Sequence, residues 1–182
     1  MDRKNILASG SQPELAELYK LIELLREKLD GALAEQFDRS LPFADVLFDR
    51  WQRAKQLGFG EGTSVYDSCC LFGNVKVGND TWVGPFTILD GSGGLEIGSH
   101  CSISAGVHIY THDTVNWAVS GGAKPFEYGP VKIGNNCYIG PNTIISRGVE
   151  IGAGTIIGAN SFVNRSFPEN SKIAGSPARL IT

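Results

Sequence analysis

The sequence predicts an all-β solenoid, a parallel β-helix built from very short strands. An aliphatic residue returns every six positions between Val77 and Val163, and the residue after it is usually glycine. Three such hexads close one triangular coil of about eighteen residues, and parallel backbone hydrogen bonding stacks neighbouring coils at roughly 4.8 Å. No α-helix has a period of six. The aliphatic positions are Val77, Val83, Leu89, Ile97, Ile103, Ile109, Ile133, Ile139, Ile145, Ile151, Ile157 and Val163.

The fifth position of each hexad supports the same fold, because it is small or β-branched. We expect these side chains to point inward beside the aliphatic column and to fit the narrow prism. Three cysteines, Cys69, Cys101 and Cys137, fall in this position, so buried packing explains them better than catalysis or disulfides. The other fifth positions are Thr81, Thr87, Val107, Thr143, Val149, Thr155 and Ser161.

The region before the solenoid has a helical pattern. Leucine and isoleucine recur at spacings of three and four after Pro13, which predicts an amphipathic helix capped at Ser11 or Gln12 and ending at Asp30–Gly31. A second helix is expected from near Pro42 to about Leu57–Gly58. These helices either cover the open end of the first coil or help to form a pocket or an oligomer contact. We therefore expect a helical region over residues 1–60 and a β-helix domain over residues 61–182.

Composition excludes several classes of protein. The 182 residues carry a net charge of −3, which is unlike the basic stripe of a nucleic-acid-binding protein. No apolar run approaches the ~20 residues of a membrane span, and the first residues lack the apolar core of a signal peptide. The sequence thus predicts a cytoplasmic protein.

The repeat is interrupted between Ile109 and Ile133, which are 24 positions apart and therefore keep the sixfold register. The intervening residues do not fit a coil, so residues 114–129 are expected to form an extruded loop that leaves and rejoins one corner. Long loops within compact repeats are usually functional. His112 stands at the foot of this loop, facing outward, where an imidazole suits general-base chemistry on a hydroxyl or amine. The alternative is an ordinary solvated histidine.

From Ile133 to Ile181 the sequence resembles the hexapeptide-repeat acyltransferases, especially the sugar O-acetyltransferases of the galactoside, maltose and nodulation-factor group. The residues that carry the resemblance are the broken coil with its histidine, the IGANS segment and the closing G-x-P-A-R. The resemblance implies a left-handed β-helix, a homotrimer, and active sites between subunits that use acetyl-CoA or another acyl-CoA. It implies no metal.

The resemblance also implies roles for individual residues. His112 matches the catalytic base, which removes a proton from the acceptor during direct acyl transfer. The positions that match contacts to coenzyme A are Ser146, Ala159, Asn164, Arg165 and Arg179. Arg165 and Arg179 are the expected phosphate partners because guanidinium groups bind phosphate oxygens in pairs. The alternative is that both arginines are only solvated charges on the surface.

Two further residues are candidates for contact with the acceptor. Asp90 occupies the glycine position of its hexad and is followed by the extra residues 91–94, so that its corner bulges. It could bind a sugar hydroxyl, orient His112, or serve only as a turn residue. Trp117 in the loop could stack on a sugar ring or anchor the loop.

We therefore expect a CoA-dependent acyltransferase that acts on a sugar or sugar nucleotide, in the biosynthesis of bacterial surface polysaccharide. Two alternatives belong to other classes of protein. A zinc enzyme of the γ-carbonic anhydrase type shares the solenoid but needs three histidines at a subunit interface, which His100, His108 and His112 do not resemble in spacing. A non-catalytic scaffold would bind no acyl-CoA.

Overall fold

The computed structural model describes residues 13–181. They form two compact units, and the boundary between these units in the sequence lies between Phe48 and Asp49. The first unit contains the helices α2 (Pro13–Phe37) and α3 (Phe43–Leu47). The second contains the helix α4 (Arg50–Gln56) and the whole solenoid. The expected helix cap at Ser11 or Gln12 lies outside the described residues.

Both helix predictions need correction. The helix α2 does not end at Asp30–Gly31 but continues to Phe37. Alanine, leucine and glutamate after Gly31 are strong helix formers, and together they outweigh the cost of about 1 kcal/mol for one internal glycine. Asp38, which adopts the left-handed conformation with φ 51°, then ends the helix.

The second predicted helix is in fact two. Phe48 is extended, with φ −107° and ψ 128°, and separates α3 from α4. The carboxylate of Asp49 accepts a hydrogen bond from the backbone N–H of Gln52 at 2.7 Å and so caps a new helix. The helix α4 covers the first coil: its Ala54 is fully buried, and the Arg53 guanidinium donates to the carbonyl of Cys69 at 2.9 Å.

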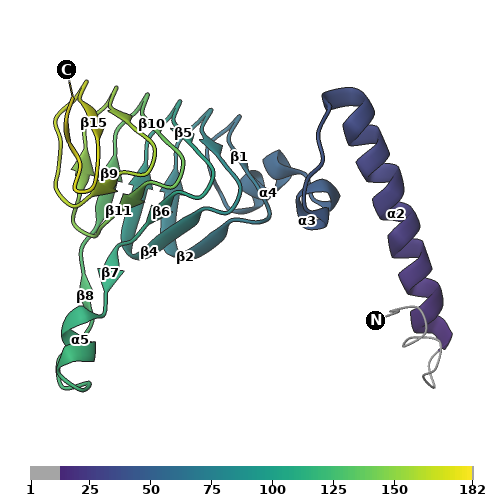
Figure 1. Ribbon diagram of the computed structural model, residues 1–182, viewed down its shortest axis with the longest axis horizontal. Coiled ribbons are helices and arrows are strands. Elements are labelled where there is room, and N and C mark those ends of the chain that lie inside the picture. The colour runs from purple at the N-terminus through teal and green to yellow at the C-terminus, as the bar shows by residue number, and fades with distance from the viewer. Residues whose placement is uncertain (1–12, 182) are drawn as a thin grey trace. The chain divides into compact units, whose positions relative to one another are not determined.

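The solenoid has three parallel faces whose strands stack along one axis (Figure 1). Strands of the first face are β1 (Ser64–Val65), β3 (Trp82–Val83), β5 (Ser102–Ile103), β10 (Tyr138–Ile139), β13 (Ile156–Ile157) and β15 (Lys172–Ala174), with β16 (Arg179–Leu180) added antiparallel at the end. Two longer strands, β2 (Cys70–Val77) and β4 (Ile88–Ile97), bend from the second face into the third. The second face continues with β6 (His108–Ile109), β11 (Ile144–Ile145) and β14 (Phe162–Val163), and the third with β9 (Val131–Ile133) and β12 (Glu150–Ile151).

The repeat positions form the core as predicted. All twelve aliphatic positions from Val77 to Val163 are buried, and so are all the fifth-position residues. The thiols of Cys69, Cys101 and Cys137 belong to this column; Cys101 donates to the carbonyl of Gly134 at 3.2 Å. The fold class is therefore confirmed as a β-solenoid that follows an N-terminal helical region.

Close approach of neighbouring coils explains the glycine that follows most of the aliphatic residues. A Cβ at Gly134 would lie 2.5 Å from the backbone nitrogen of Ala153 in the next coil, and one at Gly140 would lie 2.5 Å from that of Ala159. The left-handed conformation is instead adopted two residues later, often by asparagine, for example at Asn136 and Asn142. Corners of this type thus combine a glycine for space with a residue that tolerates positive φ.

The extruded loop has regular secondary structure. It is an antiparallel ribbon of β7 (His112–Asp113) and β8 (Glu127–Tyr128) with the short helix α5 (Val115–Val119) at its tip. Figure 1 shows the ribbon and its helix projecting away from the stacked coils. His112 pairs with Tyr128, and Asp113 pairs with Glu127.

The described part of the chain contains no helix with the length and apolar character needed to cross a bilayer.

Candidate active site

The bulged corner predicted at Asp90 exists and buries a carboxylate. Strand β4 carries two more residues than β2 between the pairs Gly73–Gly91 and Val75–Leu95. Glycine is required here, because a Cβ at Gly91 would lie 2.3 Å from the carbonyl oxygen of Asn74. The widened corner leaves room for the side chain of Asp90, which is only 1% exposed.

The carboxylate of Asp90 is surrounded by donors. Its Oδ1 accepts from the backbone N–H of Ser92 at 2.9 Å, and its Oδ2 accepts from the backbone N–H of Thr111 at 2.8 Å. Burial by itself raises the pKa of Asp90, but the hydrogen bonds from Ser92, Thr111 and His112 outweigh burial and hold that pKa well below its ordinary value of 3.8. Asp90 is therefore ionised at neutral pH.

His112 is bound directly to this carboxylate. Its Nδ1 lies 2.6 Å from Oδ2 of Asp90, and about a third of its side chain is exposed. Because Asp90 is ionised, Nδ1 must carry a hydrogen and donate it. In the neutral imidazole the other nitrogen, Nε2, is then an acceptor. A buried carboxylate that fixes the tautomer of a half-exposed histidine is a recurring arrangement for a general base.

Asp90 thus does not occupy the place expected of a residue that binds an acceptor hydroxyl. Both carboxylate oxygens are used by protein donors, and the side chain is buried. The geometry favours the orienting alternative instead. Sequence reasoning could name Asp90 only as an anomaly in its hexad, because the contact with His112 depends on how successive coils stack.

The structure gathers three of the predicted coenzyme A residues on one edge with His112. We call this corner between the second and third faces the histidine edge; it comprises residues 110–112, 146–148 and 164–166. The backbone N–H of Tyr110 donates to Ile145, and that of Ser146 donates to Val163, each at 2.9 Å. Tyr110, Ser146 and Asn164 therefore stack in successive coils, with Arg165 beside Asn164. The guanidinium of Arg165 lies 5.0 Å from the ring centre of Phe167.

The remaining two residues predicted to contact coenzyme A lie across the second face. Ala159 follows Gly158 at the corner between the first and second faces, which we call the Ala159 edge. Arg179 in β16 pairs with Ala174, whose Cβ would lie 2.9 Å from a Cβ at Gly158. Ala159 and Arg179 thus share an edge of the solenoid, but not the one that carries His112.

Trp117 lies in α5 near the tip of the ribbon. Its ring packs edge-on against Phe126 with ring centres 5.5 Å apart, and 45% of the side chain is exposed. Tyr128 lies closer to the candidate base: its ring centre is 6.0 Å from that of His112, and the two planes are inclined by 32°. Sequence reasoning missed Tyr128, because its nearness to His112 follows from the antiparallel register of the ribbon.

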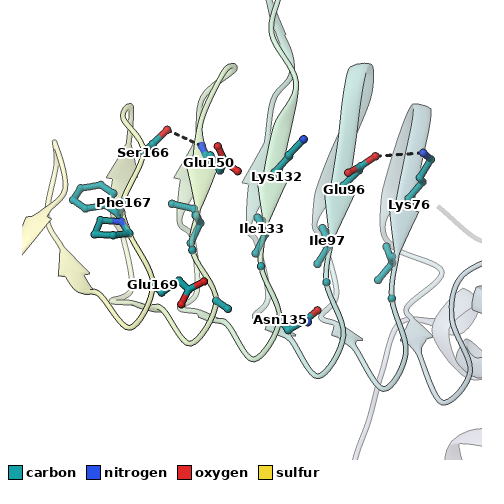
Figure 2. Close-up of a pocket in the computed structure, with 18 residues that line it drawn as sticks. Lys76, Glu96, Ile97, Lys132, Ile133, Asn135, Glu150, Ser166, Phe167 and Glu169 are labelled. Carbon is teal, nitrogen blue, oxygen red and sulfur yellow. Dashed lines mark hydrogen bonds and ion pairs between the residues drawn. The ribbon is translucent and has the colours of Figure 1, made fainter.

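A separate groove lies along the third face (Figure 2). Outward side chains of successive coils alternate in charge there, in the order Lys76, Glu96, Lys132 and Glu150. Figure 2 shows these side chains in one file, with the amine of Lys76 bonded to Glu96 at 3.3 Å. Ser166 is the only residue of the histidine edge that lines the groove. The groove is therefore distinct from the site at His112.

The three histidines do not converge. His100 lies 3.8 Å from a carboxylate oxygen of Asp80, and Nδ1 of His108 lies 3.3 Å from the hydroxyl of Tyr110. Within residues 13–181, no group of three or more histidine, cysteine, aspartate or glutamate side chains is arranged to hold a metal ion.

Comparison with known proteins agrees with the repeat. Residues 130–165 match the family described as bacterial transferase hexapeptide, six repeats. The proteins similar to this chain include hexapeptide-repeat acetyltransferases. Among curated relatives, the putative colanic acid biosynthesis acetyltransferase WcaF of Escherichia coli is 34% identical over 109 residues, which are 59% of this chain and 57% of WcaF.

Two solved structures of acyltransferases are similar to this chain. A galactoside acetyltransferase in complex with coenzyme A is 25% identical, with a TM-score of 0.65 over 88% of this chain and 81% of that one. A mutant of AntD, an N-acyltransferase from Bacillus cereus in complex with dTDP and coenzyme A, is 27% identical, with a TM-score of 0.62 over 68% of this chain and 71% of that one.

The similarity to the curated relatives covers only part of each protein. This chain spans between 51% and 62% of the length of the relatives CapG, WcaF and CaiE. The activity, substrates and partners of the whole protein are accordingly matters for proposal.

Proposed function

We propose that this protein is a CoA-dependent acyltransferase, which moves an acyl group, most simply acetyl, from acyl-CoA directly to a hydroxyl or amine of a sugar or sugar nucleotide. The observation that carries the proposal is the pair formed by His112 and Asp90 at the foot of the ribbon. Nδ1 is held by a buried, ionised carboxylate, which leaves Nε2 as the proton acceptor on a half-exposed ring.

In the proposed reaction His112 acts as the general base. Nε2 accepts the proton of the acceptor hydroxyl or amine, and the carboxylate of Asp90 stabilises the imidazolium that forms. The acyl-CoA supplies an activated thioester, so the protein needs no nucleophile of its own. Among the cysteines of the repeat, Cys101 and Cys137 are buried in the core and cannot reach a substrate.

The histidine edge fits an elongated co-substrate with a phosphate-bearing end. Ser146 and Asn164 offer polar groups one and two coils beyond His112, and the exposed guanidinium of Arg165 offers a phosphate partner. Arg179 offers a second cation on the Ala159 edge. Because these two edges flank the second face, a site that uses both is formed most simply between neighbouring copies of the chain, as the resemblance to trimeric acyltransferases implies.

The proposed acceptor class rests on relatives. WcaF is described as a colanic acid biosynthesis acetyltransferase, and AntD was solved with dTDP as an N-acyltransferase. Surface-polysaccharide biosynthesis is therefore the proposed setting, and both O- and N-acylation belong to the proposal. We also propose a cytoplasmic location, since the exposed thiol of Cys70 suits a reducing compartment.

The test compares two matched histidine substitutions. His112→Asn keeps a hydrogen-bond donor for Asp90 but removes the basic nitrogen, so thiol release from acetyl-CoA in the presence of acceptor sugars should fall by about 10²- to 10⁴-fold. Binding of coenzyme A, measured by calorimetry, should be unchanged. His100→Asn, at a left-handed corner position that asparagine accepts, is the control and should retain activity.

Full activity in His112→Asn would overturn the assignment of the base. The same measurements separate the other two classes of function. A scaffold protein would bind no coenzyme A, and stoichiometric zinc in the purified protein, with hydration of carbon dioxide, would instead support the carbonic anhydrase alternative.

A further inference from the structure

A residue outside the predicted site holds the base of the ribbon. The side chain of Arg147 reaches from the histidine edge to both strands of the ribbon: its Nε bonds Asp113 of β7, and an Nη bonds Glu127 of β8. The backbone closes the same junction, because the N–H of Gly148 donates to Gly129 at 3.1 Å and the N–H of Gly129 donates to Thr111 at 2.9 Å.

The positive charge of Arg147 offsets the repulsion between the carboxylates of Asp113 and Glu127. Asp113 and Glu127 are directly paired across the antiparallel ribbon, and like charges in that position destabilise a strand pair. The hydrogen bond from Arg147 holds the pKa of Asp113 below its ordinary value, and that of Arg147 is raised in return, chiefly by Asp113. All three side chains are about one third exposed, so solvent screens but does not abolish the attraction.

The same acids also order the rest of the ribbon. Asp113 accepts from the backbone N–H of Val115 at 3.1 Å, at the start of α5, and Glu127 bonds the side-chain amide of Asn116. The neighbours of the two acids are His112 and Tyr128, whose rings lie together. A side chain that holds Asp113 and Glu127 in place therefore also holds the candidate base, which is the residue next to Asp113.

We propose that Arg147 is a positioning residue: by joining Asp113 to Glu127 it holds the ribbon and aligns His112, and its charge compensates the two carboxylates beside the imidazole. This inference rests on the proposed role of His112. Asp90, Asp113 and Tyr128 interact with His112 directly, and Glu127 and Arg147 reach it through Asp113. Without Arg147 the carboxylates are uncompensated and favour the imidazolium, which cannot act as a base.

The central variant is Arg147→Gln, which removes the charge but keeps a polar side chain. It should lower kcat/KM at neutral pH by about 10- to 100-fold, because misplacement of a catalytic group by about 1 Å has effects of that size. The acidic limb of the kcat/KM profile should move to higher pH. Hydrogen exchange of the backbone amides of residues 113–128 should become faster, whatever the activity.

Three further variants separate position from charge. Glu127→Gln combined with Arg147→Gln restores the local net charge of the wild-type cluster without restoring the bridge, so the acidic limb should return toward its wild-type pH while exchange in the ribbon stays fast. Lys132→Gln removes one cation from the groove on the third face and should change neither quantity. Arg147→Lys should keep the charge and lose part of the bridge, so it tests the inference even where Arg147→Gln does not fold.

The inference would be overturned if the amides of residues 113–128 exchanged in Arg147→Gln at the wild-type rate. Where Arg147→Gln does not fold, the same result in Arg147→Lys would overturn it. So would an unchanged pH profile in an active enzyme. If the wild-type protein transfers no acyl group, the proposed function fails, and the exchange measurement still decides whether Arg147 holds the ribbon.

Discussion

At the scale of the residue, the candidate site depends on the contrast between a buried acid and a partly exposed base. Asp90 is 1% exposed and makes its hydrogen bonds inside the protein, whereas His112 presents about a third of its side chain to solvent. The sequence marks both residues as departures from the repeat. It cannot show that they touch, because they come from successive coils and an inserted corner brings their side chains together.

Replacing Asp90 tests the orienting role. Asp90→Asn keeps the size of the side chain, but an amide neither stabilises the imidazolium nor selects the Nδ1–H tautomer. We expect acyl transfer to fall by about 10²- to 10⁴-fold, with KM for the acceptor nearly unchanged. If Asp90 contacted the acceptor, KM would rise at nearly constant kcat, and that result would contradict the orienting role.

The same residue gives a prediction for stability against pH. The pKa of Asp90 is lower in the folded protein than its ordinary value of 3.8, so the unfolded chain binds the proton more readily. The stabilisation is therefore complete above that value and is lost as the pH falls below it. Urea unfolding of the wild type should show a steeper loss of stability below about pH 4 than unfolding of Asp90→Asn. If the free energy of unfolding of the two proteins depended on pH in the same way, the pKa of Asp90 would not be lowered by folding.

At the scale of the element, the repeat predicted the strands well and the helices and ribbon less well. Every aliphatic position of the hexads is buried, because the period states directly which side chains face inward. The end of α2 and the break at Phe48 depend on local competition between helix propensity and capping, which the apolar pattern does not contain. The contact between Arg147 and the ribbon depends on register within a segment that has no repeat at all.

A pair of neighbouring isoleucines tests the inward and outward alternation. In β13 the side chain of Ile157 is fully buried, and that of Ile156 is 45% exposed. Ile157→Ala should cost about 2–5 kcal/mol of unfolding free energy, because it leaves a cavity in a stacked column. Ile156→Ala should cost much less in chemical denaturation at low protein concentration. Equal losses would mean that the strand does not face the core as described.

At the scale of the whole molecule, the position of the predicted coenzyme A residues is the informative feature. Ser146, Asn164 and Arg165 share the histidine edge, while Ala159 and Arg179 lie on the Ala159 edge. The sequence could name all five through a family resemblance, but one chain does not bring them together. Their separation by the second face is the physical reason to expect that a neighbouring copy completes the site.

Mixing of inactive variants tests a shared site. His112→Asn and Arg179→Gln each disable a different edge, so sites in which both edges are intact re-form when the two proteins are unfolded together and refolded. A homotrimer with sites between subunits should recover activity in about a quarter of its sites, because each edge is then intact by chance in half of them. Absence of any recovery, with trimers shown by ultracentrifugation, would place all the functional residues of a site in one chain.

The most direct measurement is a crystal structure of the assembled protein with coenzyme A bound. The account predicts that the thiol sulfur lies at the foot of the ribbon, near enough to Nε2 of His112 for one acceptor oxygen to contact both. A sulfur that lies elsewhere, for instance in the groove of Lys76 to Glu150, with His112 facing no bound ligand, would contradict it.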